Sequence, residues 1–239
     1  MYDRAAAAYD VVHAARQKDY AGEAARVAAL VRERRPEARS LLDTACGTGG
    51  HLRFFPDHFD EVEGLDGSPA MLARARQRAP GVPLHQGDLR TFDLGRRFDA
   101  VTCLFSSIAY LVPVEELRRG VANLARHLVD GGVLVVEPWV KPEDWDPAPL
   151  PRIDSGQGEG LSVTRMTRSW RDGDRTYLDM QYLIGAEDGI EHVGEHHANA
   201  LYDEGDYRAA LEAAGCSIEV DPEGLIGRGL YMGIRRSAS

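Results

Sequence analysis

The chain has 239 residues, of which 44% are hydrophobic, and a formal net charge of -10. This length and apolar content suffice for one sizeable core, so we expect a single α/β domain with an inserted or appended cap. The acidic balance, without a run of Lys and Arg, argues against nucleic acid as a partner, although a few local cations can still bind a small anion.

No run of about eighteen apolar residues is present to span a bilayer, and the first ten residues carry charge where a secretory leader is apolar. We therefore expect a cytoplasmic protein without a membrane partner. The three cysteines, Cys46, Cys103 and Cys216, lack paired C-x-x-C spacing. This pattern predicts reduced, packed thiols and neither a disulfide nor a structural metal.

The first forty residues predict helix that covers another part of the fold. Val27, Leu30 and Val31 recur at helical spacing, and Pro36 closes the run. The apolar segment 40–44 then predicts a strand that ends in a glycine-rich turn.

Strand and helix signals then alternate, which is typical of a doubly wound, mostly parallel sheet with helices on both faces. Ser68 and Pro69 form a typical N-cap and first position of one of these helices. The predicted strands are 61–66, 82–88, 98–107 and 133–139, and the predicted helices are 69–79 and 114–129.

The composition changes after Trp139. Residues 141–160 are rich in Pro, Gly and Asp and predict a loop or lid, and residues 161–185 alternate about a hairpin turn at 171–174, which predicts a small antiparallel cap. A last helix and two strands follow. We thus divide the chain into a helical lid with a cofactor-binding core (1–140), a loop and cap (141–200), and a C-terminal part that completes the core (201–239).

Ligands of doubly wound sheets bind beyond the carboxyl ends of the strands, so the loops there are the expected site. After the first strand, Ala45, Gly47 and Gly49 let the backbone approach a ligand closely, and we expect a helix near Gly50 whose free amides point at it. In a methyltransferase the group at these amides is the methionine carboxylate.

After the second strand, Asp66 can accept hydrogen bonds from two ribose hydroxyls. Its spacing from the glycines suits a nicotinamide dinucleotide equally well, but the third glycine of G-x-G-x-x-G is replaced by Leu52. The glycine pattern therefore favours S-adenosylmethionine (SAM). We add Gly67 and Met71 to the expected cofactor site.

The third and fourth strand ends carry further signals. Asp88 stands where the exocyclic amine of adenine would donate, and Leu89 where the ring would pack. Phe105, followed by Ser106, places an aromatic face beside a sulfonium. Each of these residues could also be an ordinary turn, cap or core residue. Their joint placement on consecutive strand ends favours a class I, SAM-dependent methyltransferase.

Four segments resemble the N,N-dimethyltransferases of thymidine-diphosphate-linked (dTDP-linked) amino sugars, such as the desosamine and mycaminose enzymes. They are LLDTACGTGGHL at 41–52, 84–111 with FSSIAYL, GGVLVVEPW at 131–139, and GRGLYMG at 227–233. The first is shared by many methyltransferases, whereas FSSIAYL, VLVVEPW and GRGLYMG are narrower. The resemblance covers nearly the whole chain and implies successive methylation of an exocyclic sugar amine, without a strong general base.

The resemblance also implies residue roles. Tyr9 and Tyr20 would close over cofactor and sugar, Tyr110 and His197 would lie near the acceptor, and Arg228 would neutralise the diphosphate, which its planar fork suits. A helix anchor for the tyrosines and a strand-end hydroxyl for Tyr110 remain open alternatives. Of these residues we expect Tyr9, Tyr110 and His197 to be catalytic, and the other expected substrate residues are Lys18, Trp139 and Lys141.

The pair His196 and His197 does not predict a metal site, because adjacent residues of a strand point to opposite faces. Two departures from the family pattern lie on the acceptor side: Val140 and Lys141 stand where relatives have a further aromatic and an apolar residue, and Ala198 stands where they have a basic one. The sugar, or the carbon that bears its amine, can therefore differ from the macrolide cases, and Lys141 is either a phosphate ligand or a solvated lid residue.

Two other functions stay open from sequence. One is an O- or C-methyltransferase for another small metabolite, although no base or metal to ionise a hydroxyl is evident. The other is a SAM-binding partner subunit without turnover. Homodimerisation is left open as well.

Overall fold

The computed structural model describes residues 2–237, and their side chains from residue 6 onwards. Its helices are α1 (Tyr2–Ala15), α2 (Tyr20–Arg34), α3 (Pro69–Arg78), α4 (Val114–Arg126) and α5 (Glu204–Ala213), with 3-10 helices η1 (Leu52–Asp57) and η2 (Ser107–Tyr110). The strands of the larger sheet are β1 (Ser40–Thr44), β2 (Glu61–Asp66), β3 (Leu84–Gln86), β4 (Phe98–Cys103), β5 (Leu128–Val136), β10 (Cys216–Asp221) and β11 (Leu230–Arg235).

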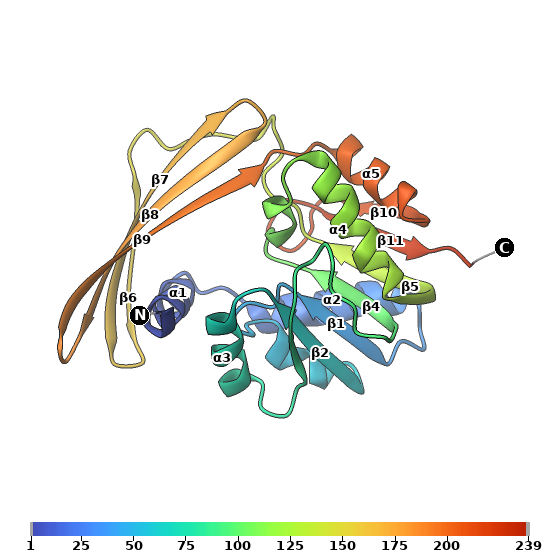
Figure 1. Ribbon diagram of the computed structural model, residues 1–239, viewed down its shortest axis with the longest axis horizontal. Coiled ribbons are helices and arrows are strands. Elements are labelled where there is room, and N and C mark those ends of the chain that lie inside the picture. The colour runs from blue at the N-terminus through green and yellow to red at the C-terminus, as the bar shows by residue number, and fades with distance from the viewer. Residues whose placement is uncertain (1, 238–239) are drawn as a thin grey trace.

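The larger sheet has the strand order β10-β11-β5-β4-β1-β2-β3 (Figure 1). Strands β1 to β5 are mutually parallel, whereas β11 runs antiparallel to both of its neighbours. The order reverses at β1 and β4, so the loops that follow these strands diverge and leave room for a ligand. The predicted doubly wound, mostly parallel sheet is confirmed.

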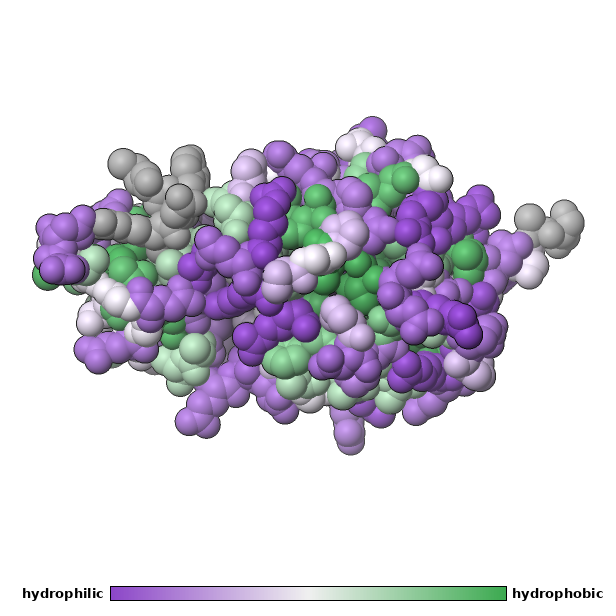
Figure 2. All heavy atoms as spheres, turned by 90° about the horizontal axis from the view of Figure 1, so that it is seen from below, coloured by the Kyte–Doolittle hydropathy of each residue, from purple (hydrophilic) through white to green (hydrophobic). Residues whose placement is uncertain are grey.

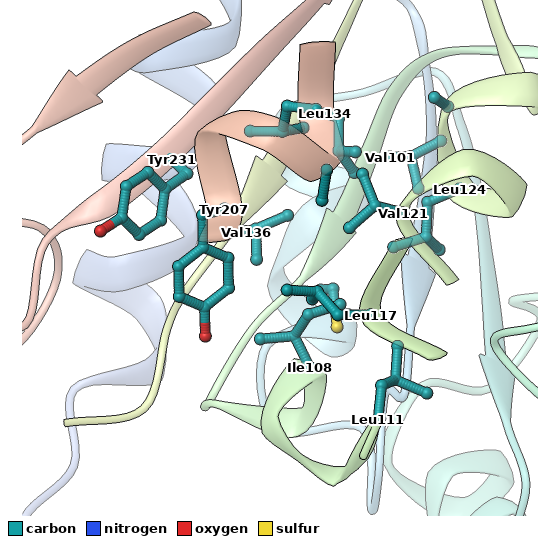
Figure 3. Packing of buried hydrophobic residues seen from close by; sticks show 14 of the residues in the cluster. Val101, Ile108, Leu111, Leu117, Val121, Leu124, Leu134, Val136, Tyr207 and Tyr231 are labelled. Carbon is teal, nitrogen blue, oxygen red and sulfur yellow. The ribbon is translucent and has the colours of Figure 1, made fainter. Parts of the chain in front are cut away.

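Two hydrophobic cores lie on opposite faces of this sheet, because successive strand residues face opposite sides. Leu42 belongs to the core beneath α4 and α5, and its neighbour Leu41 to the core beneath α2 and α3. On α4, the residues Leu117, Val121 and Leu124 share one face at helical spacing and point into the first of these cores (Figure 3).

The N-terminal third differs from expectation in two places. The first forty residues form two helices, because the Asp19 side chain caps α2 by accepting from the amide of Gly22. The helix expected near Gly50 is instead the short 3-10 helix η1, which contains Pro56. Proline lacks the amide hydrogen that a continuing α-helix requires, so the amides near the cavity belong to a turn rather than to a helix end.

The cap is a separate antiparallel sheet in the order β6-β7-β8-β9, formed by β6 (Arg152–Gly158), β7 (Leu161–Asp172), β8 (Arg175–Ala186) and β9 (Gly189–Ala200). The predicted hairpin is confirmed, since Asp172 pairs with Arg175 across its turn. The prediction of a loop for 141–160 is wrong at β6. Its Ser-, Gly- and Gln-rich sequence has low strand propensity, and it is a strand because its backbone pairs with the edge of β7.

Helix α1 packs against the cap rather than the larger sheet. Ala8, Val11 and Val12 form a third hydrophobic cluster with Val163 and Ile184. The helix thus lies between the cap and α3 (Figure 1). The domain boundaries at 140 and 200 stay a prediction. Helix α1 belongs to the first predicted part of the chain but packs on strands of the second, β6 to β8.

Within the described residues, no helix is long and apolar enough to cross a membrane. Hydrophilic residues dominate the face shown in Figure 2. All three cysteines are buried and free, as predicted.

Candidate active site

A cavity of about 1500 Å³ lies between the carboxyl ends of β1 to β4 and the inner face of the cap. Ligand pockets for one small molecule measure about 300–1,000 Å³, so this cavity has room for two ligands side by side. Of the predicted site residues, only Gly49 and Lys141 lie outside its lining. Gly49 has a φ of +80° and packs on Ala75 of α3, where a Cβ would come within 3.2 Å of the backbone.

The turn after β1 is open to a ligand. Ala45 and Gly47 adopt positive φ values of 50° and 56°, and a Cβ on Gly47 would meet nothing within 4 Å. A Cβ on Gly50 would instead meet the Tyr20 ring at 2.6 Å. The turn therefore presents bare backbone to the cavity and is closed on one side by an aromatic ring.

Asp66, at the end of β2, fastens two loops together. Its Oδ2 accepts from the amide of Gly47 at 2.8 Å, and its Oδ1 accepts from the amide of Ser68 at 2.8 Å. Burial raises the pKa of the carboxyl, and the hydrogen bonds to backbone amides oppose that shift. Each carboxylate oxygen keeps acceptor capacity, so Asp66 can serve ribose hydroxyls while it holds the turn.

Asp88 is more exposed and already paired. Its Oδ1 accepts from the backbone amide of Arg90 at 2.8 Å and from Nε of that residue at 2.7 Å, and its Oδ2 pairs with Nη2. Hydrogen bonds from Arg90 lower the pKa of the Asp88 carboxyl to about 2. An adenine amine would therefore share this carboxylate with Arg90. Leu89 lines the cavity and packs against the core beneath α4.

The loop after β4 holds two non-glycine residues in the left-handed region. Phe105 has a φ of 55° and Ser106 a φ of 63°, a conformation that L-residues adopt only when their surroundings impose it. The buried Glu137 supplies that constraint, since its Oε2 accepts from the amide of Phe105 at 2.6 Å. Sequence reasoning used this residue only as part of a motif.

Lys18 lines the cavity and is already paired with a carboxylate, and its substrate role stays a prediction. Its Nζ is 2.6 Å from both carboxylate oxygens of Glu23 and 4.5 Å from the centroid of the Phe105 ring. Glu23 also contacts Nε2 of His51 at 2.6 Å. This buried cluster joins the start of α2 to the turn after β1, and neither Glu23 nor His51 was predicted.

Tyr110 of η2 forms a hydrogen-bonded row with two side chains of the cap strand β9. Oη of Tyr110 is 2.9 Å from Nδ1 of His197, whose Nε2 is 3.3 Å from Oε2 of Glu195. Desolvation raises the pKa of Tyr110 to about 12, so the phenol stays protonated, and the tautomer of His197 decides which of the two groups donates. Glu195 was not predicted, although its place two residues before His197 on β9 puts both on one face.

His196 points away from the cavity with 76% of its side chain exposed, as the alternation of a strand requires. Among the residues that the structure describes, no group of three or more His, Cys, Asp and Glu side chains is placed to hold a metal ion.

Arg228 lies beside the loop after β4. Its Nη1 donates to Oγ of Ser106 at 3.1 Å, and its guanidinium lies 4.6 Å from the centroid of the Trp139 ring. A guanidinium has five N–H donors, so donors remain for a phosphate. Two more arginines line the cavity on the cap side. Arg165 of β7 is buried, Arg16 follows α1 and is exposed, and both bind Asp154. Neither arginine was predicted.

Helix α1, the N-terminal lid, is held in place by the buried carboxylate of Asp10. Asp10 of α1 accepts from Oγ1 of Thr48 at 2.6 Å, from Nη1 of Arg78 at 2.8 Å and from Nη2 of Arg74 at 3.1 Å. Glu159, in the β6–β7 turn, pairs with the same two arginines of α3. Both α1 and the cap are thus held over the strand ends.

The strand ends fit SAM. The open backbone at Gly47, the remaining acceptor capacity of Asp66 and the aromatic ring of Phe105 suit an amino acid group, a ribose and a sulfonium in turn.

Comparison with known proteins gives the same picture. A methyltransferase-domain family model matches residues 41–132. The chain is 48% identical over 227 residues to the dTDP-3-amino-3,6-dideoxy-alpha-D-glucopyranose N,N-dimethyltransferase of Streptomyces fradiae, which covers 95% of this chain and 89% of the relative. It is 44% identical to the dTDP-4-amino-2,3,4,6-tetradeoxy-D-glucose N,N-dimethyltransferase of Saccharopolyspora spinosa, over 95% and 91% of the two chains.

Among solved structures, SAM-bound CalS10, an amino pentose methyltransferase from Micromonospora echinaspora, matches with a TM-score of 0.84. The identity is 44%, and the match covers 95% of this chain and 96% of the other.

Proposed function

This chain belongs to the family of SAM-dependent N,N-dimethyltransferases of dTDP-linked amino sugars, and from that premise we propose that it methylates the exocyclic amine of a dTDP-linked deoxy amino sugar. The single observation that carries the proposal is the two-walled cavity. One wall consists of the strand-end loops that suit SAM, and the other consists of cap side chains that can contact a second ligand.

SAM, when bound, supplies an electrophilic methyl group on a positively charged sulfur. Asp66 and the turn at Gly47 would hold its ribose and its amino acid part, and the ring of Phe105 would face the sulfonium. Helix α1 and the cap, fastened through Asp10, would exclude water from the reacting groups. A neutral amine is already a good nucleophile, so alignment and desolvation can supply most of the rate.

On the acceptor side we assign Tyr110 and His197 to contacts with the sugar near its amine, and Tyr9 to closure over it. Desolvation raises the pKa of both the Tyr9 and the Tyr110 hydroxyl, so both act as neutral hydroxyls rather than as bases. Arg228 would bind the diphosphate. Lys141 lies outside the cavity lining, which favours a solvated residue of the loop after Trp139 over a phosphate ligand.

The rival O-methyltransferase reaction has less support at this site. It requires a group that ionises a hydroxyl, whereas two relatives that match 95% of this chain are N,N-dimethyltransferases. A non-catalytic SAM-binding subunit would not need the cap cavity. We also keep a cytoplasmic location as a proposal. The net charge of -10 supports the proposed absence of nucleic-acid partners. Light scattering would decide between monomer and homodimer.

The function is tested by incubating the pure protein with SAM and three dTDP-sugars, one with a 3-amine, one with a 4-amine and one with a hydroxyl in place of the amine. Mass spectrometry should show gains of one and then two methyl groups on an amino sugar and none on the hydroxyl sugar. The two relatives differ in the carbon that bears the amine, so the preferred isomer settles which type this chain resembles. SAM binding without methylation of any amino sugar would refute the proposal.

A further inference from the structure

The last turn of α1 places one imidazole between the cap and the loop after β4. His13 is only 5% exposed, yet its side chain lines the cavity. Its ring centroid lies 4.2 Å from that of Tyr9 and 5.1 Å from that of Phe105, with the Phe105 ring nearly perpendicular to it. His13 therefore adjoins both the ring that faces the expected sulfonium and a tyrosine of the acceptor side.

His13 has no hydrogen-bond partner for its ring nitrogens among the side chains that the structure describes. Most buried polar groups are paired, so an unpaired imidazole on a cavity wall is suited to contact a ligand. Neither the motifs of the sequence nor the roles assigned above account for it.

The surroundings keep this imidazole neutral. Burial lowers the pKa of His13 to about 3, and the positive charges of Arg165, Arg16 and Lys18 act in the same direction. Asp154 opposes them, but it is shared between Arg16 and Arg165. A neutral group in this position does not repel a sulfonium.

The same pKa excludes His13 as the base that deprotonates the substrate. A free amine near a carbohydrate ring resembles an α-amino group, with a pKa of about 8. Transfer of its proton to an imidazole with a pKa of about 3 is therefore unfavourable by about 10⁵-fold. A neutral imidazole can still accept a hydrogen bond.

We propose that His13 is a further catalytic residue, whose unprotonated ring nitrogen accepts a hydrogen bond from the sugar amine and thereby turns the nitrogen lone pair towards the methyl group. This inference rests on the proposed function and names a contact that it requires. In the transfer, the amine nitrogen bonds to the methyl carbon, the carbon–sulfur bond breaks with its electron pair going to sulfur, and the nitrogen then releases one proton to solvent.

The hydrogen bond strengthens during this step. Positive charge develops on the attacking nitrogen and makes its N–H a better donor, so the contact stabilises the transition state more than the bound substrate. A primary and a secondary amine both carry an N–H, so the contact serves both transfers. The dimethylated product, as a free base, has none and loses the contact.

Two substitutions separate this role from simple ring packing. His13→Phe keeps a ring between Tyr9 and Phe105 but removes the acceptor, whereas His13→Gln removes the ring but keeps an acceptor. We expect His13→Phe to lower kcat for amine methylation by about 10- to 100-fold, and His13→Gln to stay within about fivefold of the unaltered protein. If ring packing were the role, the order of the two variants would be reversed.

Binding and stability are read in parallel. His13→Phe should bind SAM within about twofold of the unaltered protein in calorimetry and unfold at a similar temperature. The KM for the sugar nucleotide should change less than kcat. The exposed His196 on the outer face of the cap provides the matched control, and His196→Gln should leave kcat unchanged.

The pH dependence of kcat/KM tests whether His13 acts as a base. The acid limb of kcat/KM should reflect the substrate amine and stay in place in His13→Gln, because His13, flanked by Tyr9, Arg16, Lys18, Arg165 and Asp154, does not titrate in that range. The inference is overturned if His13→Phe keeps full kcat, if it loses SAM affinity as much as kcat, or if the acid limb disappears in His13→Gln. Failure of the unaltered protein to methylate any amino sugar would overturn the proposed function instead.

Discussion

Removal of the Asp66 carboxylate should weaken SAM binding strongly. A hydrogen bond to a charged group contributes about 1.5–3 kcal/mol, and two ribose hydroxyls can be bound. The carboxylate also fixes the turn through the amides of Gly47 and Ser68, both at 2.8 Å. Allowing for water that replaces part of the loss, we expect Asp66→Ala to cost about 2–4 kcal/mol, which is about 30- to 1,000-fold in Kd.

The SAM affinity of Asp66→Asn should fall between that of the unaltered protein and that of Asp66→Ala. The side-chain amide keeps one acceptor but turns a donor towards the backbone amide of either Gly47 or Ser68. Isothermal titration calorimetry with SAM measures both variants without any need for turnover, and circular dichroism checks their fold. Asp60, which is exposed and remote from the cavity, gives the control Asp60→Ala. SAM affinity of Asp66→Ala within about threefold of the unaltered protein would refute the assignment of the ribose to this carboxylate.

Three further changes test other parts of the molecule. Arg228→Ala should raise the KM for the sugar nucleotide by about 10- to 100-fold with SAM affinity little changed; equal losses for both ligands in steady-state kinetics and calorimetry would contradict a phosphate role. Asp10→Ala leaves Arg74 and Arg78 without their buried partner, so urea denaturation should show a loss of about 2–4 kcal/mol in the free energy of unfolding, and an unchanged midpoint would show that the lid is held otherwise. Burial raises the pKa of Asp43 to about 6, so its ionisation destabilises the folded state increasingly as pH rises from about 4 to about 6. The free energy of unfolding that Asp43→Asn gains should therefore be larger by about 1 kcal/mol at about pH 7 than at about pH 5. A gain that does not depend on pH would exclude a raised pKa.

The larger sheet could be predicted from sequence because its signals are local. Strands such as β5 contain short apolar runs, helices such as α4 repeat apolar residues at fixed spacing, and residues such as Ser68 and Pro69 mark where a helix begins. The strand-end rule then placed Asp66 and Phe105 at one cavity without any knowledge of distances.

The lid and cap contacts could not be predicted, because they depend on partners far along the chain. Asp10 is one acidic residue in an alanine-rich helix, and its partners Thr48 and Arg78 follow 38 and 68 residues later. His13 gives no motif, and its place on the cavity wall depends on how α1 packs against the cap. Strand β6 likewise exists only through its pairing with β7.

The most direct test of methyl transfer to nitrogen uses SAM with an isotopically labelled methyl carbon and a dTDP-amino sugar with an isotopically labelled amine nitrogen. After incubation with the pure protein, nuclear magnetic resonance of the sugar should show a one-bond coupling between the two labels, first for one methyl group and then for two. A labelled methyl group that appears on the sugar without this coupling would mean transfer to oxygen or carbon and would contradict the account.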